Sequence, residues 1–334
     1  MVSGPPWRLK AMAPLTVVFC ALTMCAVIVD RVAPGAPASR MLLHRDTSNP
    51  FGVVGAVEYP RHAVGVDGVR VNLPRPARRI VSQEWSLDEY LYSLVPAERV
   101  IGVSQAAYDG RFSNISDIAA RLRPTIAADV EAVVTMNPDL VIVSSTARAD
   151  FTELLRTAGV PVYRAYTTPT SLAEIEQQIR ILGYLVADDA AAAAVWSTFH
   201  EAVALAALRR PAADAPRVLG LNGHFAYGSH TVFDDVLRVL GATNVAAAAG
   251  VEGYTLMNPE EILRANPGWI ITGAPIDTED DVRERLLADV SLATTDAGRA
   301  GRVVVVDQRV FTALSPFTAR LLETLGDALY GRKS

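Results

Sequence analysis

The densest group of side chains that could contact a ligand lies in one short stretch, from Asn222 to His230. It contains the histidines His224 and His230 and the aromatic residues Phe225 and Tyr227. An imidazole can ligate a metal or donate a hydrogen bond, and an aromatic face can stack on a flat ring. A bare transition-metal site takes about three or four ligands, so the stretch is only the start of one. It therefore predicts a small-molecule site and leaves bare metal binding as an alternative.

Further candidates are polar and aromatic residues at the ends of predicted strands, namely Trp85, Tyr108, Ser145, Arg148 and Tyr254. The aromatic residues could stack on a macrocycle or a catechol ring. Arg148 could pair with a carboxylate or phosphate of the ligand. Each has an ordinary structural explanation as well, because aromatic residues near strand ends often belong to the core and an arginine often lies on a solvated helix start.

The sequence lacks the motifs of common enzyme sites. It has no G-x-G-x-x-G after a strand, no Walker loop, no G-x-S-x-G and no H-E-x-x-H. Cys20 and Cys25 are the only cysteines, and both lie in an apolar N-terminal run, which excludes disulfides from the rest of the chain. The net charge is -5, and no basic stripe of the kind that binds nucleic acid is present. We therefore expect a non-catalytic protein with no resident cofactor and no nucleic-acid partner.

The elements that must position these residues are short apolar strands alternating with helices. The predicted strands lie at 80–81, 100–103, 140–143, 161–163, 218–221, 269–271 and 303–306. Buried strands that alternate with helices are typical of parallel sheets covered on both faces. Such sheets bind ligands beyond the carboxyl ends of their strands, which is where the candidates above are expected. The fold class predicted is α/β, with two Rossmann-like lobes.

A region without strand signals, from Thr168 to Pro216, separates the two sets of strands. Within it, a helix from Asp188 to Arg210 would be about 33 Å long and could join the lobes stiffly. The predicted domains are 1–38 for a signal peptide or membrane anchor, 39–77 for a tether and hairpin, 78–168 for the N-terminal lobe, 169–215 for a helical segment with the interlobe helix, and 216–334 for the C-terminal lobe.

The N-terminus has the pattern of an export signal. Arg8 and Lys10 precede an apolar run from Ala11 to Val29, which is also long enough to span a bilayer as an anchor. Ala36-Pro37-Ala38 offers a weak cleavage site, and Cys25 a weak lipidation site. We expect a periplasmic or extracytoplasmic protein tethered to the cytoplasmic membrane by this segment, with cleavage, lipidation and retention all left open.

An internal echo relates the two halves of the chain. In each, a glutamate, Glu131 or Glu260, opens a short helix that ends at Asn-Pro and leads into a buried strand. Proline cannot continue the helical ladder, which explains the stop. The repetition predicts two similar lobes related by pseudo-symmetry. The two carboxylates either favour their helix N-termini or dock onto a two-fold symmetric partner.

Four blocks in this order resemble a known family, the helical-backbone periplasmic binding proteins of ABC importers for ferric siderophores, haem and cobalamin. The blocks are 67–82, 99–104, 130–142 with 154–155 and 159–162, and 231–237 with 241–246 and 260–271. The resemblance implies a monomer with two α/β lobes, a rigid interlobe helix and a shallow cleft for a small-molecule chelate. It also implies that Glu131 and Glu260 contact arginines of an ABC permease dimer in the cytoplasmic membrane.

The chain departs from the family pattern after the first strand. Gln83-Glu84-Trp85 stands where small residues are usual, and the following helix contains Asp88-Glu89-Tyr90. For this reason no particular chelate is implied. An anchored ligand-sensing domain of the same fold is a further alternative.

Overall fold

The computed structural model describes residues 58–121, 129–187, 189–210 and 214–331. All of them belong to a single unit of the chain. The predicted signal or anchor, most of the tether, the possible lipidation site Cys25 and the predicted helix start Asp188 lie outside the described residues.

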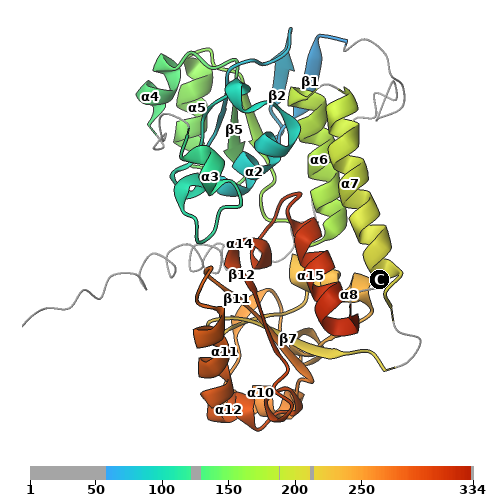
Figure 1. The fold of residues 1–334 in the computed structure, drawn as a ribbon. Helices are drawn as coiled ribbons and strands as arrows, with labels where there is room; N and C mark the ends of the chain where they lie inside the picture. Colours follow the sequence, from blue (N-terminus) through green and yellow to red (C-terminus); the bar gives the residue numbers. More distant parts are fainter. Residues whose placement is uncertain (1–57, 122–128, 188, 211–213, 332–334) are drawn as a thin grey trace, which may run out of the picture. The chain divides into compact units, whose positions relative to one another are not determined.

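Lobe 1 is built on a four-stranded parallel sheet with the order β4-β3-β5-β6. The strands are β3 (Ile80–Ser82), β4 (Val100–Gly102), β5 (Leu140–Ser144) and β6 (Val162–Ala165). The helical elements are α2 (Trp85–Leu94), η1 (Ala97–Arg99), η2 (Gln105–Tyr108), α3 (Ser116–Ala119), α4 (Val130–Thr135) and α5 (Ala149–Thr157). Every residue of β3 and β5 is buried, because helices lie on both faces of the sheet (Figure 1).

A hairpin of β1 (Arg61–Val64) and β2 (Arg70–Leu73) packs on lobe 1 beside β6. Gly68 has a φ of 76° in the turn, a conformation that glycine adopts without steric cost. Residues Asp67 and Gly68 thus lie in the turn of this hairpin, within the range 39–77 in which a hairpin was expected. The amide of Val66 donates to the Arg164 carbonyl at 3.0 Å, which fixes the turn to the edge of the lobe.

Lobe 2 has a larger, mixed sheet with the order β10-β8-β7-β11-β12, and β9 pairs with β7. The strands are β7 (Arg217–Asn222), β8 (Phe225–Tyr227), β9 (Thr243–Asn244), β10 (Tyr254–Leu256), β11 (Trp269–Ala274) and β12 (Val303–Asp307). The helices are α8 (Val232–Leu240), α9 (Val245–Ala248), α10 (Pro259–Ala265), α11 (Glu279–Ala288), α12 (Val290–Ala293), α13 (Asp296–Arg299), α14 (Gln308–Phe311) and α15 (Thr318–Tyr330).

The two-lobed α/β fold is confirmed, and lobe 2 adds antiparallel strands to its parallel core. Strands β7, β9, β11 and β12 pair in parallel, whereas β8 and β10 are antiparallel additions. The stretch from Asn222 to His230, which holds the densest group of candidate residues, thus includes strand β8. A turn at Gly223, with a φ of 61°, reverses the chain between β7 and β8.

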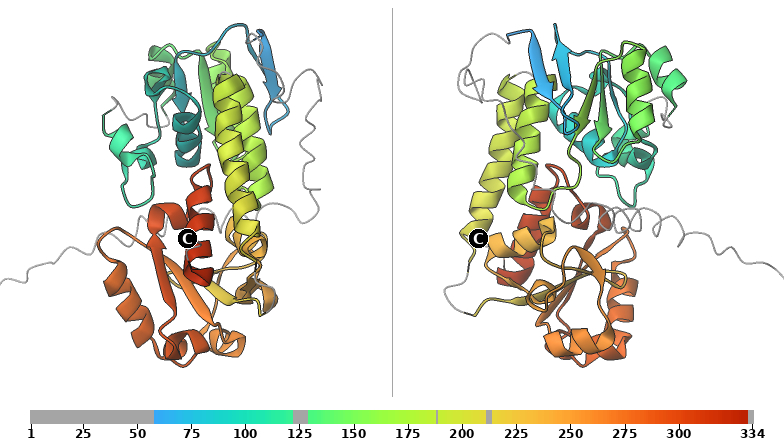
Figure 2. Two further views of the ribbon diagram at one scale, coloured as in Figure 1. Left: turned by 45° about the vertical axis from the view of Figure 1, so that its right-hand side comes forward. Right: turned by 180° about the vertical axis from the view of Figure 1, so that it is seen from behind.

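Two helices lie side by side and carry the chain from one lobe to the other, α6 (Leu172–Val186) and α7 (Asp189–Ala207) (Figures 1 and 2). Helix α7 packs on its neighbour α6, on α2 in lobe 1 and on α8 and α15 in lobe 2. At the junction of α6 and α7, the buried Arg61 side chain donates to the carbonyls of Tyr184 (2.5 Å) and Ala187 (3.2 Å). It also pairs with Asp189 at 2.8 Å, so the hairpin and both helices are joined by one guanidinium.

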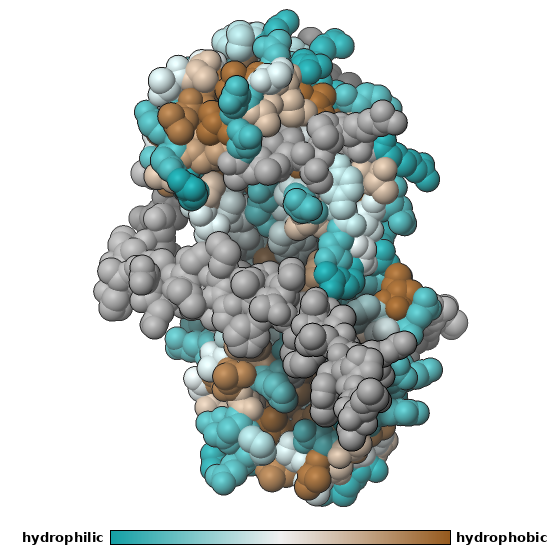
Figure 3. Space-filling view, turned by 90° about the vertical axis from the view of Figure 1, so that its left-hand side faces the viewer, coloured by the Kyte–Doolittle hydropathy of each residue, from teal (hydrophilic) through white to brown (hydrophobic). Residues whose placement is uncertain are grey.

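Figure 3 shows hydrophilic residues over much of the described surface on one side, with hydrophobic residues in separate patches.

The hydrophobic core of lobe 1 lies between its sheet and helices α4 and α5, where Val133 and Phe151 meet Val81 and Val141. A corresponding core in lobe 2 gathers residues of β7, β11 and α10, including Leu219, Ile270 and Ile262.

The echo predicted from the sequence is present as α4–β5 in lobe 1 and α10–β11 in lobe 2. The structure adds a detail to each helix end. Asn137 has a φ of 48° and Asn266 a φ of 40°, and both lie in the left-handed region. Asparagine tolerates this conformation better than most residues, so each Asn turns the chain out of the helix before proline prevents its continuation.

Candidate ligand-binding cleft

Trp85 follows strand β3 of lobe 1 and lies at the carboxyl edge of the sheet. Glu84 caps the helix that follows, because its Oε2 accepts hydrogen bonds from the amides of Ser86 (3.0 Å) and Leu87 (3.1 Å). Helix α2 therefore begins at Trp85, which is half-buried. Trp85 is therefore partly exposed at this edge of the sheet.

The neighbouring strands β5 and β6 end in a group of hydroxyls. Ser144 Oγ lies 2.7 Å from Thr167 Oγ1, and Ser145 Oγ lies 3.2 Å from the same atom. Ser144 and Thr167 are buried, whereas Ser145 is half-buried. A hydroxyl both donates and accepts, so Ser145 can hydrogen-bond an uncharged polar group of a ligand.

Three arginines in the segments after strands β4, β5 and β12 are each paired with an aspartate two residues away. Arg111 lies 2.6 Å from Asp109, and Arg309 lies 2.6 Å from Asp307. The side-chain hydrogen bond from Arg111 is the main cause that lowers the pKa of Asp109. Such two-point pairs neutralise the guanidinium and fix its direction.

Arg148, predicted as a contact for a ligand anion, is the third of these arginines. It pairs with Asp150 and lies just before α5, with 80% of its side chain exposed. The side-chain hydrogen bond to Asp150 raises the pKa of Arg148. The Arg148 guanidinium is therefore already paired with the Asp150 carboxylate in the absence of a ligand.

An aromatic cluster in lobe 2 contains two of the predicted stacking residues. Tyr227 is only 4% exposed, and its ring contacts those of Phe233, Tyr254 and Phe311. Tyr254 is half-buried and stands edge-on to Tyr227, with ring centroids 4.7 Å apart. Tyr227 thus supports the cluster from within, and Tyr254 is its outer ring. Phe225, at the start of β8, is also half-buried.

The remaining candidates are spread over both lobes. His224 and His230 are exposed, and His230 has a φ of 58°. Tyr108 is half-buried in η2, and burial raises the pKa of its hydroxyl. Among the residues that the structure describes, no group of three or more His, Cys, Asp or Glu side chains could hold a metal ion. The histidine pair therefore gains no further metal ligands within this part of the chain.

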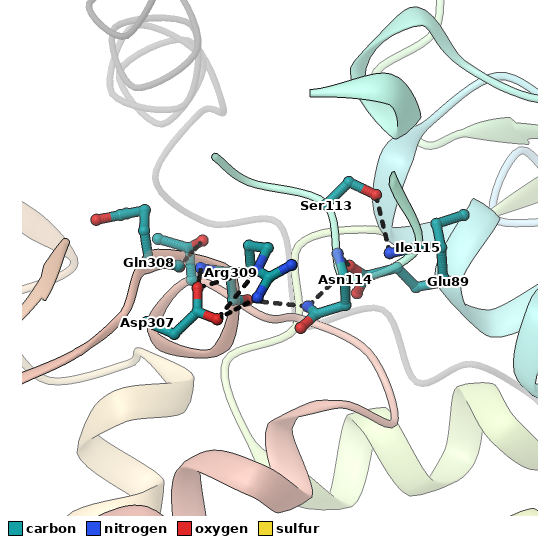
Figure 4. Close-up of polar contacts among 8 residues, drawn as sticks. Glu89, Ser113, Asn114, Ile115, Asp307, Gln308 and Arg309 are labelled. Carbon is teal, nitrogen blue, oxygen red and sulfur yellow. Dashed lines mark hydrogen bonds and ion pairs between the residues drawn. The ribbon is translucent and has the colours of Figure 1, made fainter. Parts of the chain in front are cut away.

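Polar contacts between the lobes were not predicted from the sequence (Figure 4). The Asn114 amide and side-chain nitrogen donate to Glu89 Oε1 at 2.8 and 2.9 Å. The same side-chain nitrogen donates to the Arg309 carbonyl of lobe 2 at 3.0 Å. Ser315 of lobe 2 donates its hydroxyl to Glu89 Oε2 at 2.5 Å.

Three acidic side chains are packed into the start of α2. Burial raises the pKa of Asp88 and of Glu89 to about 7, and it also raises the pKa of Glu84. Asp88 forms its hydrogen bonds within lobe 1, where its Oδ2 accepts from the Ser104 hydroxyl (2.6 Å) and amide (3.1 Å). The sequence marked this segment only as a departure from the usual small residues.

The chain matches the model of a protein family described as "Periplasmic binding protein" over residues 80–310, which include most of both lobes. The chain belongs to the periplasmic binding protein family. Members of this family act outside the cytoplasm and bind solutes rather than transform them. The predictions of an extracytoplasmic solute-binding protein and of a non-enzyme are thereby confirmed.

Three of the similar proteins have names that refer to metal macrocycles. A cobalamin-binding protein of Halobacterium salinarum is 26% identical over 323 residues, which cover 95% of this chain and 84% of that protein. A solved periplasmic haem-binding protein from Roseiflexus sp. RS-1, in apo form, is 25% identical with a TM-score of 0.61 and covers 76% of this chain and 98% of that one. Another solved haem-binding protein, in complex with two haems, is 25% identical with a TM-score of 0.62 and covers 76% of this chain and 100% of that one.

Proposed function

We propose that the protein captures a corrinoid such as cobalamin outside the cytoplasm and delivers it to the permease dimer of an ABC importer. The cobalamin-binding relative, which aligns with 95% of the chain, supports this choice of ligand. The candidate residues support it through their chemistry. They offer aromatic faces at Trp85 and Tyr254 and a hydroxyl at Ser145, which suit a macrocycle with uncharged amide side chains.

The observation that carries the corrinoid proposal is the pairing of the three arginines in the segments after strands β4, β5 and β12. Arg111, Arg148 and Arg309 are each bound to a neighbouring aspartate. A haem presents two propionate carboxylates, and a ferric tris-catecholate is an anion of high charge. Either ligand would have to compete with these aspartates for the guanidinium groups, at a cost in affinity. An amide-rich corrin does not need them.

The proposed delivery step uses one carboxylate on each lobe. Glu131 lies in the first turn of α4 and Glu260 in the first turn of α10, and both are exposed. Their equivalent places in the echoed units suit a permease dimer with two equivalent basic sockets. A membrane tether formed by the N-terminal segment would keep the protein near that permease.

The test is a titration of the full-length protein with three probes, namely cyanocobalamin, haemin and a ferric tris-catecholate. We expect calorimetry to show saturable binding of cyanocobalamin, and protein isolated from its own host to carry a corrinoid absorption spectrum. Preferential binding of haemin, with a Soret band in the isolated protein, would replace the corrinoid by haem. A flat response to all three probes would overturn the chelate proposal and favour the sensing-domain alternative.

A further inference from the structure

Glu89 occupies an unusual position for a carboxylate, because it is fully buried and contacts both lobes. Its Oε1 accepts two hydrogen bonds from Asn114 within lobe 1, and its Oε2 accepts one from Ser315 of lobe 2. Asn114 extends the contact by donating to the Arg309 carbonyl. Figure 4 shows Glu89 and Asn114 facing the Arg309 segment across the lobe boundary.

The lobe 2 residues in this contact belong to a segment that links the candidate cleft to the helix pair. Arg309 lies in α14 directly after β12, and Asp307 holds its side chain. Ser315 is fully buried and precedes α15, which packs on α7. A bond to Glu89 therefore restrains the whole segment between the ligand side and the interlobe helices.

A second set of cross-lobe contacts lies at the helix pair. Asp235 of α8 accepts a hydrogen bond from the Leu172 amide at the start of α6, at 2.9 Å. Helix α7 also packs on both lobes. The contacts at the helix pair consist of a helix start and packed helix faces, and such contacts can act as a hinge between the lobes. The contact at Glu89 differs from them, because it consists of a few hydrogen bonds that can break together.

We propose that Glu89 and Asn114 form an interlobe latch, which holds the segment from Arg309 to Ser315 against lobe 1 and opens when the lobes separate. The latch acts without regard to which ligand is bound. Its role is to set the distance between the two lobes, so Glu89 and Asn114 are positioning residues rather than ligand contacts.

The latch also takes up a proton when it closes. In an open state Glu89 would be solvated and would titrate near the usual value for glutamate, whereas burial in the closed contact raises its pKa to about 7. Because the closed state has the higher pKa, closure is favoured as the pH falls and is weakened as the pH rises through about 7.

Other charged and titratable groups act on the same carboxyl. The nearby groups are Glu84, Tyr90, Arg309 and, through its effect on Arg309, Asp117. Glu84 raises the pKa of Glu89 further, after burial as the main cause. The charge of Arg309 is largely neutralised by Asp307, so it offsets little of the burial effect.

The experiment measures the distance between the lobes in ligand-free protein. Spin labels are placed on the exposed helix-end residues Thr157 and Ala288 by Thr157→Cys and Ala288→Cys, with Cys20 and Cys25 replaced by serine in the full-length chain. The measured quantity is the ratio of molecules with the short interlobe distance to molecules with the long one. We expect this ratio to fall by about tenfold when the pH is raised from about 5.5 to about 8.

The variants separate the latch from general stability. Glu89→Gln keeps groups that can bond Asn114 and Ser315 but cannot ionise, so the short distance should persist at both pH values. Ser315→Ala, a mild change, should lengthen the distance at both. Asp88→Asn is the matched control, because Asp88 is an equally buried acid whose pKa is also raised to about 7 but whose hydrogen bonds stay within lobe 1.

Two results would overturn the latch. One is an interlobe distance that is the same in the parent protein, Glu89→Gln and Ser315→Ala at both pH values. The other is a loss of pH dependence in Asp88→Asn equal to that in Glu89→Gln, which would assign the effect to lobe 1 as a whole. Since no ligand is added, neither result depends on whether the corrinoid proposal is correct.

Discussion

At the scale of single residues, the aromatic cluster of lobe 2 assigns different roles to two tyrosines that the sequence could not distinguish. Tyr227 contacts three other aromatic rings and is nearly inaccessible, whereas Tyr254 covers it from outside. The chain pattern offered no basis for this distinction, because both tyrosines lie near glycines in short polar segments. Their substitution should therefore give different phenotypes.

We expect Tyr227→Ala to lower the free energy of unfolding by about 3–5 kcal/mol, because it leaves a cavity among packed rings. Tyr254→Ala should weaken cyanocobalamin binding by roughly 1–3 kcal/mol while changing stability much less. Urea unfolding and calorimetric titration of the two variants measure these effects. Tyr227→Phe, which keeps the ring, is the control for the first variant. Unchanged affinity in Tyr254→Ala would remove that ring from the site.

At the scale of elements, the two Asn-Pro sequences serve as matching helix terminators. Asn137 and Asn266 adopt left-handed backbone angles at the ends of α4 and α10. Each lies just before an interior strand of its sheet, β5 in lobe 1 and β11 in lobe 2. The register of that strand depends on the turn, since a shift by one residue would reverse which side chains face the core.

Asn137 gives a direct test of this turn. Asn137→Gly should leave stability almost unchanged, because glycine adopts positive φ without steric cost. Asn137→Val should lower the free energy of unfolding by about 1–3 kcal/mol, since a β-branched residue is strained there. Thermal and urea unfolding would measure both. Equal stabilities for the glycine and valine variants would show that the backbone angle at this position is unimportant.

At the scale of the whole molecule, the two-lobed arrangement places one exposed acidic residue on an equivalent helix of each lobe. Glu131 and Glu260 are separated along the chain by the interlobe helices, yet they occupy the same position in the repeated α4–β5 and α10–β11 units. A two-fold partner would therefore meet a similar acidic contact on each lobe. The pair of equivalent carboxylates requires both lobes, since each helix supplies only one of them.

Reversing both charges, with Glu131→Arg and Glu260→Arg, should abolish uptake of labelled cyanocobalamin by the native host while leaving binding to the purified protein intact. The reason is that like charges facing basic sockets repel. The double variant Glu153→Arg and Glu284→Arg is the control, because it reverses one exposed charge on each lobe at other helices. Normal uptake by the first double variant would refute the docking role.

The sequence by itself determined the features that depend on neighbouring residues. Apolar strand patterns, helical spacing and the Asn-Pro echo are local, and they were enough to predict two α/β lobes joined by a long helix. Trp85 and Ser145 could be placed at strand ends for the same reason.

Only the tertiary structure decided which residues meet across the fold. Glu89 and Ser315 are 226 positions apart, and no periodicity connects them. The burial of Tyr227 and the antiparallel pairing of β10 with β8 depend likewise on the path of the chain. Hydrogen bonds between distant segments follow from how the lobes pack, and local propensity carries no information about that packing.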